Sequence, residues 1–159
     1  MKVRDVMTVD VLTADPDTTV NRIAQLMNSR AVSGIPVIDG ARHVVGMVTE
    51  LDLIVRNTRL DPPAFFPILD GRIPLETPGH YRQRLQHMLG TRAAEVMTEK
   101  VVTIGPDAEI EDLAELLMRR RVNPVPVVEN DMLVGIVSRA DLIRMMSREL
   151  EADSEVGPS

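Results

Sequence analysis

Apolar residues recur at helical spacing in two places along the chain. Each set occupies positions i, i+3, i+4 and i+7, the pattern of one buried helix face: Val20, Ile23, Ala24 and Met27, and again Ile110, Leu113, Ala114 and Leu117. Two short apolar runs follow each set and predict paired strands, at 35–38 and 44–48, and at 125–128 and 133–137. Turns are expected between the paired strands, at Asp39-Gly40 and at 129–131.

A short β-prone segment precedes each of these helices, and a further helix is expected after each strand pair. The β-prone segments, 11–13 and 101–103, each end at a Pro-Asp turn. Thr18 or Thr19 can cap the first helix, and the later helices are expected to open at Thr49 and Ser138. The predicted unit is therefore β-α-β-β-α. Its strands are apolar on both faces, so each needs cover on two sides, which a second unit can provide.

The two units are copies of one sequence. Residues 6–39 align with 96–129 with 13 identities in 34 positions, and residues 45–54 align with 134–143 with 6 identities in 10. The offset is 90 in the first alignment and 89 in the second, and Val6-Met7-Thr8 returns as Val96-Met97-Thr98. Such self-similarity indicates a duplicated structural unit. We expect copy one to span 1–54 and copy two to span 93–146.

The segment between the copies, residues 55–92, has a different composition. It holds five of the eleven prolines and all three aromatic residues of the chain, Phe65, Phe66 and Tyr81. Its first half is expected to be extended and rich in turns. Its second half predicts a helix over 78–89, with Thr77 as N-cap and Gly90 as the stop. A polar tail is expected over 147–159, with fraying over 151–159.

Composition narrows the classes of function. The net charge of −6, from 18 basic and 24 acidic residues, argues against non-specific nucleic-acid binding. With three aromatic residues, the chain offers few rings on which bases could stack, and the core must be aliphatic. The absence of cysteine excludes thiol catalysis, cysteine-ligated zinc and iron–sulfur centres. No apolar run approaches the roughly 20 residues of a membrane-spanning helix. The first residues lack a signal-peptide core, so we expect a cytoplasmic protein without membrane insertion.

Sequence signatures of catalysis are absent. The chain has no P-loop, no dinucleotide-binding glycine turn, no nucleophile elbow and no H-E-x-x-H helix. His80 and His87 would share one face of a helix but lie about 10 Å apart along its axis, too far to share a metal ion. We therefore expect neither an enzyme nor a metal site.

A polar element recurs at the start of each later helix. Gly46-Met47-Val48-Thr49-Glu50-Leu51-Asp52 is echoed by Gly135-Ile136-Val137-Ser138-Arg139-Ala140-Asp141. One interpretation is a capping box, in which the hydroxyl and the acid three residues later satisfy the first backbone N–H groups of the helix. The other is an anion-binding helix N-terminus whose carboxylate also accepts the hydroxyls of a ribose. Taken alone, the residues favour capping.

Taken together, the repeated motifs resemble a tandem pair of CBS domains, a Bateman module. The resemblance covers about two-thirds of the chain and rests on Val6-Met7-Thr8, Thr13-x-x-Pro16, the stretch 32–37 and Gly46-x-Val48-Thr49-x-x-Asp52, with their copies. It implies a mixed α+β fold, in which two β-α-β-β-α motifs pack through their sheets about a pseudo-twofold axis. It also implies clefts that bind AMP, ADP, ATP or S-adenosylmethionine as a regulatory ligand. Such pairs often form homodimers and regulate a partner enzyme or transporter.

The resemblance assigns residues of both copies to each cleft. One copy holds the base, and the Ser/Thr-x-x-Asp element of the other holds ribose and phosphate. For cleft one, the implied residues are Thr13, Val32, Ser33, Ile35 and Pro36 with Ser138 and Asp141. For cleft two, they are Thr103, Val122, Asn123, Val125 and Pro126 with Thr49 and Asp52. A purine held between aliphatic side chains needs no aromatic partner, which fits the composition.

Two features depart from the family pattern. Members that grip nucleotide phosphates often carry a basic residue just before the proline-containing strand, where this chain has Ser33-Gly34 and Asn123-Pro124. Arg30 and residues 119–121 are expected to cap helix ends or face solvent. Arg139 is the better phosphate candidate, and because Glu50 takes its place in copy one, we expect cleft one to be the better nucleotide site. The long connection between the copies is expected to cover a cleft or contact a second chain.

Two hypotheses follow. The leading one is a non-catalytic sensor of adenosine-containing ligands, whose occupancy fixes the relative angle of the copies and alters a surface presented to a partner. The alternative is a structural or oligomerisation module with vestigial clefts. In that case Asp52 and Asp141 serve only to start helices.

Overall fold

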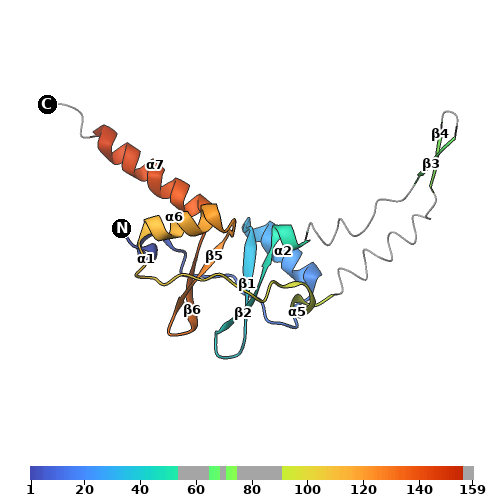
Figure 1. Cartoon of the computed structure of the whole chain (residues 1–159), viewed down its shortest axis with the longest axis horizontal. Helices are drawn as coiled ribbons and strands as arrows, with labels where there is room; N and C mark the ends of the chain where they lie inside the picture. Colours follow the sequence, from blue (N-terminus) through green and yellow to red (C-terminus); the bar gives the residue numbers. More distant parts are fainter. Residues whose placement is uncertain (54–64, 69–70, 75–90, 156–159) are drawn as a thin grey trace.

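The computed structural model of the chain describes residues 1–53, 65–68, 71–74 and 91–155, with side chains for 1–53 and 91–152. Figure 1 shows a mixed α and β architecture, as predicted. In chain order the elements are α1 (Val3–Val6), α2 (Val20–Arg30), β1 (Gly34–Ile38), β2 (Val44–Thr49), β3 (Phe65–Ile68), β4 (Gly71–Pro74), α5 (Ala93–Val96), α6 (Ile110–Arg119), β5 (Val125–Glu129), β6 (Met132–Val137) and α7 (Arg139–Glu155). Residues 50–53 are also helical.

Two antiparallel hairpins form the centre of the molecule. β1 pairs with β2 and β5 with β6, and the registers match, since Pro36 faces Met47 as Pro126 faces Ile136. Each hairpin has an irregularity at the same place, after Val37 in one and after the equivalent valine in the other. Figure 1 shows the hairpins side by side, and the backbone N–H of Leu133 donates to the carbonyl of Arg42 across them at 3.0 Å. The repeat seen in the sequence is therefore a repeat in three dimensions.

The residues that open each copy pair with the other copy. Thr8 exchanges two backbone hydrogen bonds with Ile136 of β6, at 2.8 and 2.9 Å. Thr98 does the same with Met47 of β2, at 2.9 and 3.0 Å. The second strand of each hairpin is thus hydrogen-bonded to a residue near the start of the other copy.

The hydrophobic cores follow the same exchange. Val3 of α1 is fully buried in the core of copy two, and Ala93 of α5 is fully buried in the core of copy one. Among the described residues, the buried hydrophobic side chains are aliphatic or methionine throughout, as the composition required. The hydrophobic core of each copy therefore includes a residue from the start of the other copy, and these residues hold the two copies together.

Two local expectations differ from the structure. Residues 11–13 do not form a strand, because only Ala14 pairs with β1, and the chain then turns at once where the N–H of Asp17 donates to the carboxylate of Asp15 at 2.8 Å. Helix α7 continues to Glu155 through the expected frayed tail. Arginine, glutamate, leucine and alanine over 148–152 are good helix formers, which accounts for the extension.

The segment between the copies contains a third hairpin, in which β3 pairs with β4. The helix expected over 78–89, and with it Tyr81, lies outside the described residues. Within the described part of the chain, no helix is both long and apolar enough to cross a membrane.

Candidate functional site

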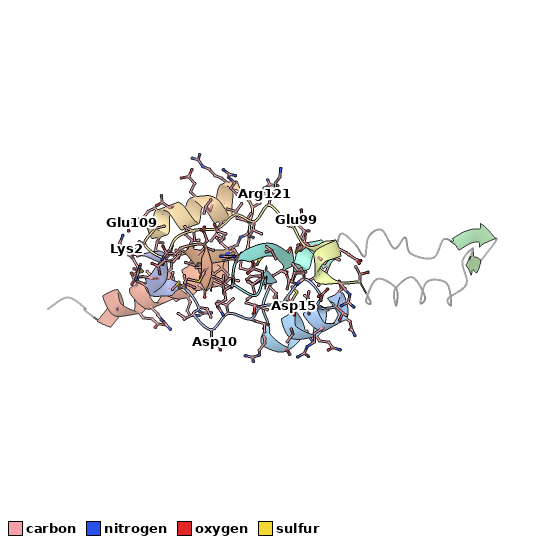
Figure 2. The ribbon with its side chains drawn as sticks, turned by 90° about the horizontal axis from the view of Figure 1, so that it is seen from below. Lys2, Asp10, Asp15, Glu99, Glu109 and Arg121 are labelled. Carbon is pink, nitrogen blue, oxygen red and sulfur yellow. The ribbon has the colours of Figure 1, made fainter. Side chains whose placement is uncertain are left out.

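Two cavities open where the copies meet, and each draws on both copies. The first, of about 620 Å³, is lined by residues 10–12 and 30–34 of copy one and by 138–141 of copy two. The second, of about 380 Å³, is lined by the equivalent segments 100–102 and 121–124 of copy two and by 49–52 of copy one. These positions correspond to the expected cleft one and cleft two. Figure 2 shows Asp10 of cleft one and Arg121 of cleft two on opposite faces of the molecule.

The structure brings together five of the residues expected in cleft one: Val32, Ser33, Ser138, Arg139 and Asp141. The other three do not line the cavity. Ile35 and Pro36 are fully buried in β1. Thr13 is replaced along the wall by Val11 and Leu12, which precede it in the chain.

The same shift occurs in cleft two. Four of its expected residues line the cavity: Thr49, Asp52, Val122 and Asn123. Val125 and Pro126 are buried in β5, and Thr103 gives way to Val101 and Val102. These valines were visible in the sequence as an apolar pair. The prediction missed them because it treated the segment as a strand ending at a ligand-binding threonine.

The Ser/Thr-x-x-Asp elements cap the starts of their helices. In copy one, Oδ2 of Asp52 accepts from the backbone N–H and the hydroxyl of Thr49, at 2.9 and 3.1 Å. In copy two, Oδ2 of Asp141 accepts from the same groups of Ser138, at 2.7 and 2.8 Å. One carboxylate oxygen of each acid is therefore used for capping, as favoured from the sequence. The other oxygen faces a different partner in each copy.

Those partners make the two acids chemically unequal. Oδ1 of Asp141 forms a 2.9 Å salt bridge with Arg144, and Asp141 is 8% exposed. Oδ1 of Asp52 accepts from the hydroxyl of Thr98 at 3.2 Å, and Asp52 is half-buried. The donor to Asp52 is a neutral hydroxyl, whereas the donor to Asp141 is a guanidinium cation that also neutralises its charge. A ribose hydroxyl can therefore replace the partner of Asp52 more easily than that of Asp141.

A shared wall separates the two cavities. Asn123 lies at its centre, donating from Nδ2 to the hydroxyl of Ser33 at 3.3 Å and accepting at Oδ1 from the backbone N–H of Arg139 at 2.9 Å. Glu50 and Arg139, which occupy equivalent positions in the repeat, each line both cavities. Arg139 therefore lines cleft one and Glu50 lines cleft two, as expected, but each also lines the other cavity. These two residues give no basis for ranking cleft one first.

The remaining charges differ between the cavities. Arg30 and Arg121 are exposed, as expected, and they also line cleft one and cleft two respectively. Counting the shared residues, three basic and three acidic side chains line cleft one. Three basic and two acidic side chains line cleft two. Cleft two therefore has the more favourable charge for an anionic ligand.

No group of three or more acidic or histidine side chains placed to hold a metal ion occurs in the described part of the chain. His80 and His87 lie outside it.

Comparison with known proteins gives one consistent family. The CBS domain model matches residues 3–56 and 93–148. The chain is 30% identical over 148 residues to the CBS domain-containing protein YhcV of Bacillus subtilis, covering 92% of this chain and 87% of the relative. Among solved structures, CBSX2 in complex with AMP superposes with a TM-score of 0.69 at 25% identity, over 92% of this chain and 96% of that one. The CBS domain pair of protein MJ0100, in complex with 5′-methylthioadenosine and S-adenosyl-L-methionine, has a TM-score of 0.69 at 19% identity, over 92% and 99%.

Proposed function

This chain belongs to the CBS domain family, and from that premise we propose that it is a non-catalytic regulatory module that binds an adenosine-containing ligand between its two CBS domains. The AMP complex of CBSX2 and the nucleoside complex of the MJ0100 pair support this class of ligand. Cavities of about 380 and 620 Å³ are within the usual range for small-molecule sites. The cytoplasmic location and the existence of a regulated partner stay predictions.

We assign AMP to cleft two, and the environment of Asp52 carries this assignment. Its Oδ1 has a neutral hydroxyl partner that a ribose hydroxyl can replace. Lys100, Arg121 and Arg139 line the same cavity and suit a phosphate. In this proposal the purine lies against Val101, Val102 and Val122.

The regulatory step follows from the shared construction of the site. A ligand in cleft two touches Asp52 of copy one and Val122 of copy two, so it stabilises one relative orientation of the copies. Thr98, which pairs with β2 and donates to Asp52, belongs to the exchanged segment and directly follows α5 and its C-cap Met97. Binding is therefore expected to shift this segment and the surface around it, which a partner can detect.

Thermal unfolding with AMP, ADP, ATP and S-adenosylmethionine tests the proposal. A ligand at 100 times its Kd adds about 2.7 kcal/mol to the free energy of unfolding, which raises the Tm of a chain of this size by about 5–10 °C. We expect a rise of that order with AMP, and its loss in Asp52→Asn. Asp112→Asn, the same chemical change on the exposed side of α6, should keep the full rise. No rise with any of the four ligands in the wild-type chain would contradict the proposal.

A specific observation also favours self-association through α7. Its residues Ile143, Met146 and Leu150, at i, i+3 and i+7, are 64%, 56% and 69% exposed. Figure 1 shows the C-terminal part of α7 projecting away from the hairpins. Basic residues predominate in its first half and acidic residues in its second. An antiparallel pair of α7 helices would therefore match opposite charges along one apolar stripe. We propose that two chains associate in this way, with Met146 near the twofold axis.

Cysteine crosslinking tests this association, since the chain has no cysteine of its own. Met146→Cys is expected to form a disulfide-linked dimer under mild oxidation. Met118→Cys places a thiol at a side chain that is 78% exposed on α6, and it should stay uncrosslinked at the same protein concentration. Equal crosslinking of the two variants, or none, would count against pairing through α7.

A further inference from the structure

Positions 10 and 100 are equivalent in the repeat but carry opposite charges. Asp10 lines cleft one and Lys100 lines cleft two, each directly before the apolar pair that forms the wall of its cavity. Both side chains are exposed, so each can turn toward a bound ligand without a desolvation cost. The two clefts therefore present a carboxylate and an ammonium group at the same point of their rims.

The surrounding charges do not cancel this difference. In cleft one, Arg144 is held by Asp141 at 2.9 Å. Each cleft also has one arginine at or just after the C-terminal end of α2 or α6, Arg30 in cleft one and Arg121 in cleft two, so these two residues contribute equally. Glu50 and Arg139 line both cavities and so favour neither.

We infer that Asp10 and Lys100 are specificity determinants: Lys100 makes cleft two the site of a nucleoside monophosphate, and Asp10 makes cleft one the site of a nucleoside without phosphate. The inference rests on the proposed function and extends it to two different ligand classes in one chain. Charges at exposed rims act over about 8 Å at physiological ionic strength, far enough to act on a 5′-phosphate held within the same cavity. A neutral or cationic 5′-substituent meets no repulsion from Asp10.

Charge exchange between the two positions tests the inference. Isothermal titration with AMP and with adenosine would compare the wild-type chain, Lys100→Asp, Asp10→Lys and the double exchange. We expect one AMP and two adenosine molecules per wild-type chain. Lys100→Asp should weaken AMP about tenfold and leave adenosine within twofold. Asp10→Lys should add a second AMP site.

The double exchange shows which cleft is used. In that variant the single AMP site should move to cleft one, so that adding Asp141→Asn abolishes AMP binding and adding Asp52→Asn does not. In the wild-type background the effects of these two changes should be reversed. Raising the salt concentration from 0.05 to 0.5 M should narrow the difference in AMP affinity between the wild-type chain and Lys100→Asp, because the charges are screened.

The outcomes separate this inference from the proposed function. AMP binding that is insensitive to both charge changes would overturn the inference and leave the proposed function standing. Equal weakening of AMP and adenosine by Lys100→Asp would also overturn it, because such a loss does not depend on phosphate. A wild-type chain that binds neither AMP nor adenosine would overturn the proposed function itself.

Discussion

Gly46 and Gly135 each lie against a methionine side chain from the opposite copy. A Cβ atom on Gly46 would come within 2.7 Å of Cγ of Met97, and one on Gly135 within 2.5 Å of Sδ of Met7 and 3.2 Å of the Thr8 carbonyl oxygen. The Val-Met-Thr and glycine motifs of the repeat are therefore one packing arrangement, used twice. Their spacing in the sequence gives no sign of this contact, because the partners belong to different copies.

Gly46→Ala is accordingly expected to destabilise the chain. The added methyl group would clash with Cβ and Cγ of Met97, the atoms nearest the Met97 backbone, which cannot move away as easily as the end of the side chain. Overpacking of this kind costs about 1–3 kcal/mol. Urea unfolding measures the change in the free energy of unfolding. Gly105→Ala is the matched control, since a Cβ atom there meets nothing within 4 Å. Equal destabilisation by the two substitutions would contradict the packing account.

The capping acids show how far residue-level prediction reached. Asp52 and Asp141 were identified from spacing, because a capping box is a local interaction between residues three apart. Their second partners were not predictable in the same way. Thr98 is 46 residues from Asp52, and the pairing depends on how the copies pack. The inequality of the two acids, and with it the proposed preference for cleft two, emerges only in three dimensions.

At the scale of elements, α1 is anchored to copy two through polar contacts. Nζ of Lys2 donates to the Asp107 carbonyl at 2.8 Å and to the Glu109 carboxylate at 3.0 Å. The hydrogen bond from Lys2 lowers the pKa of Glu109 below its ordinary value of 4.5. The same bond raises the pKa of Lys2 above 10.5. Because α1 carries the buried Val3, these contacts hold part of the core of copy two in place.

The sign of the pH dependence follows from the lowered pKa of Glu109. Its contribution to stability is present above about pH 4.5 and is lost as the pH falls through the folded-state value. Thermal unfolding of the wild-type chain and Glu109→Gln should therefore differ at pH 6 and converge toward pH 3. A difference in Tm that stays constant over this range would show that the ion pair does not contribute to folding stability.

Elements that depend on residues close together in the sequence were the ones predicted correctly. Helical periodicity placed α2 and α6, and Thr19 caps α2 as expected, accepting from the N–H of Arg22 at 3.2 Å. The hairpin of β3 and β4 was not predicted, because Pro67 and Pro74 argue against strands. A two-stranded hairpin consists only of edge strands, where proline is tolerated. Residues 11–13, by contrast, were predicted to be a β segment from a weak β signal, and they do not form a strand.

At the scale of the whole molecule, the duplication in the sequence predicted a paired architecture, and the resemblance of the repeated motifs to CBS domains predicted the family; both were confirmed. The exchange of α1 and α5 between the cores was not predicted, since alignment of the repeats assigns each segment to its own copy. The boundaries 1–54 and 93–146 therefore stay a prediction about the repeats in the sequence, and they do not coincide with the two hydrophobic cores. The shared wall of Asn123, Glu50 and Arg139 arises from the same close association.

This association is also what makes ligand binding a signal in the proposed account. Each cleft requires both copies, and the exchanged segments connect the clefts to the outer edges of both hairpins. A ligand bound in cleft two can therefore alter a surface that it does not touch.

A crystal structure of the chain grown with millimolar AMP would show which cleft binds the nucleotide. We expect electron density for AMP in cleft two, with its ribose hydroxyls on Asp52, its purine against Val122 and its phosphate toward Lys100. A fully occupied AMP in cleft one with cleft two empty, or no AMP in either cleft, would overturn the assignment of AMP to cleft two.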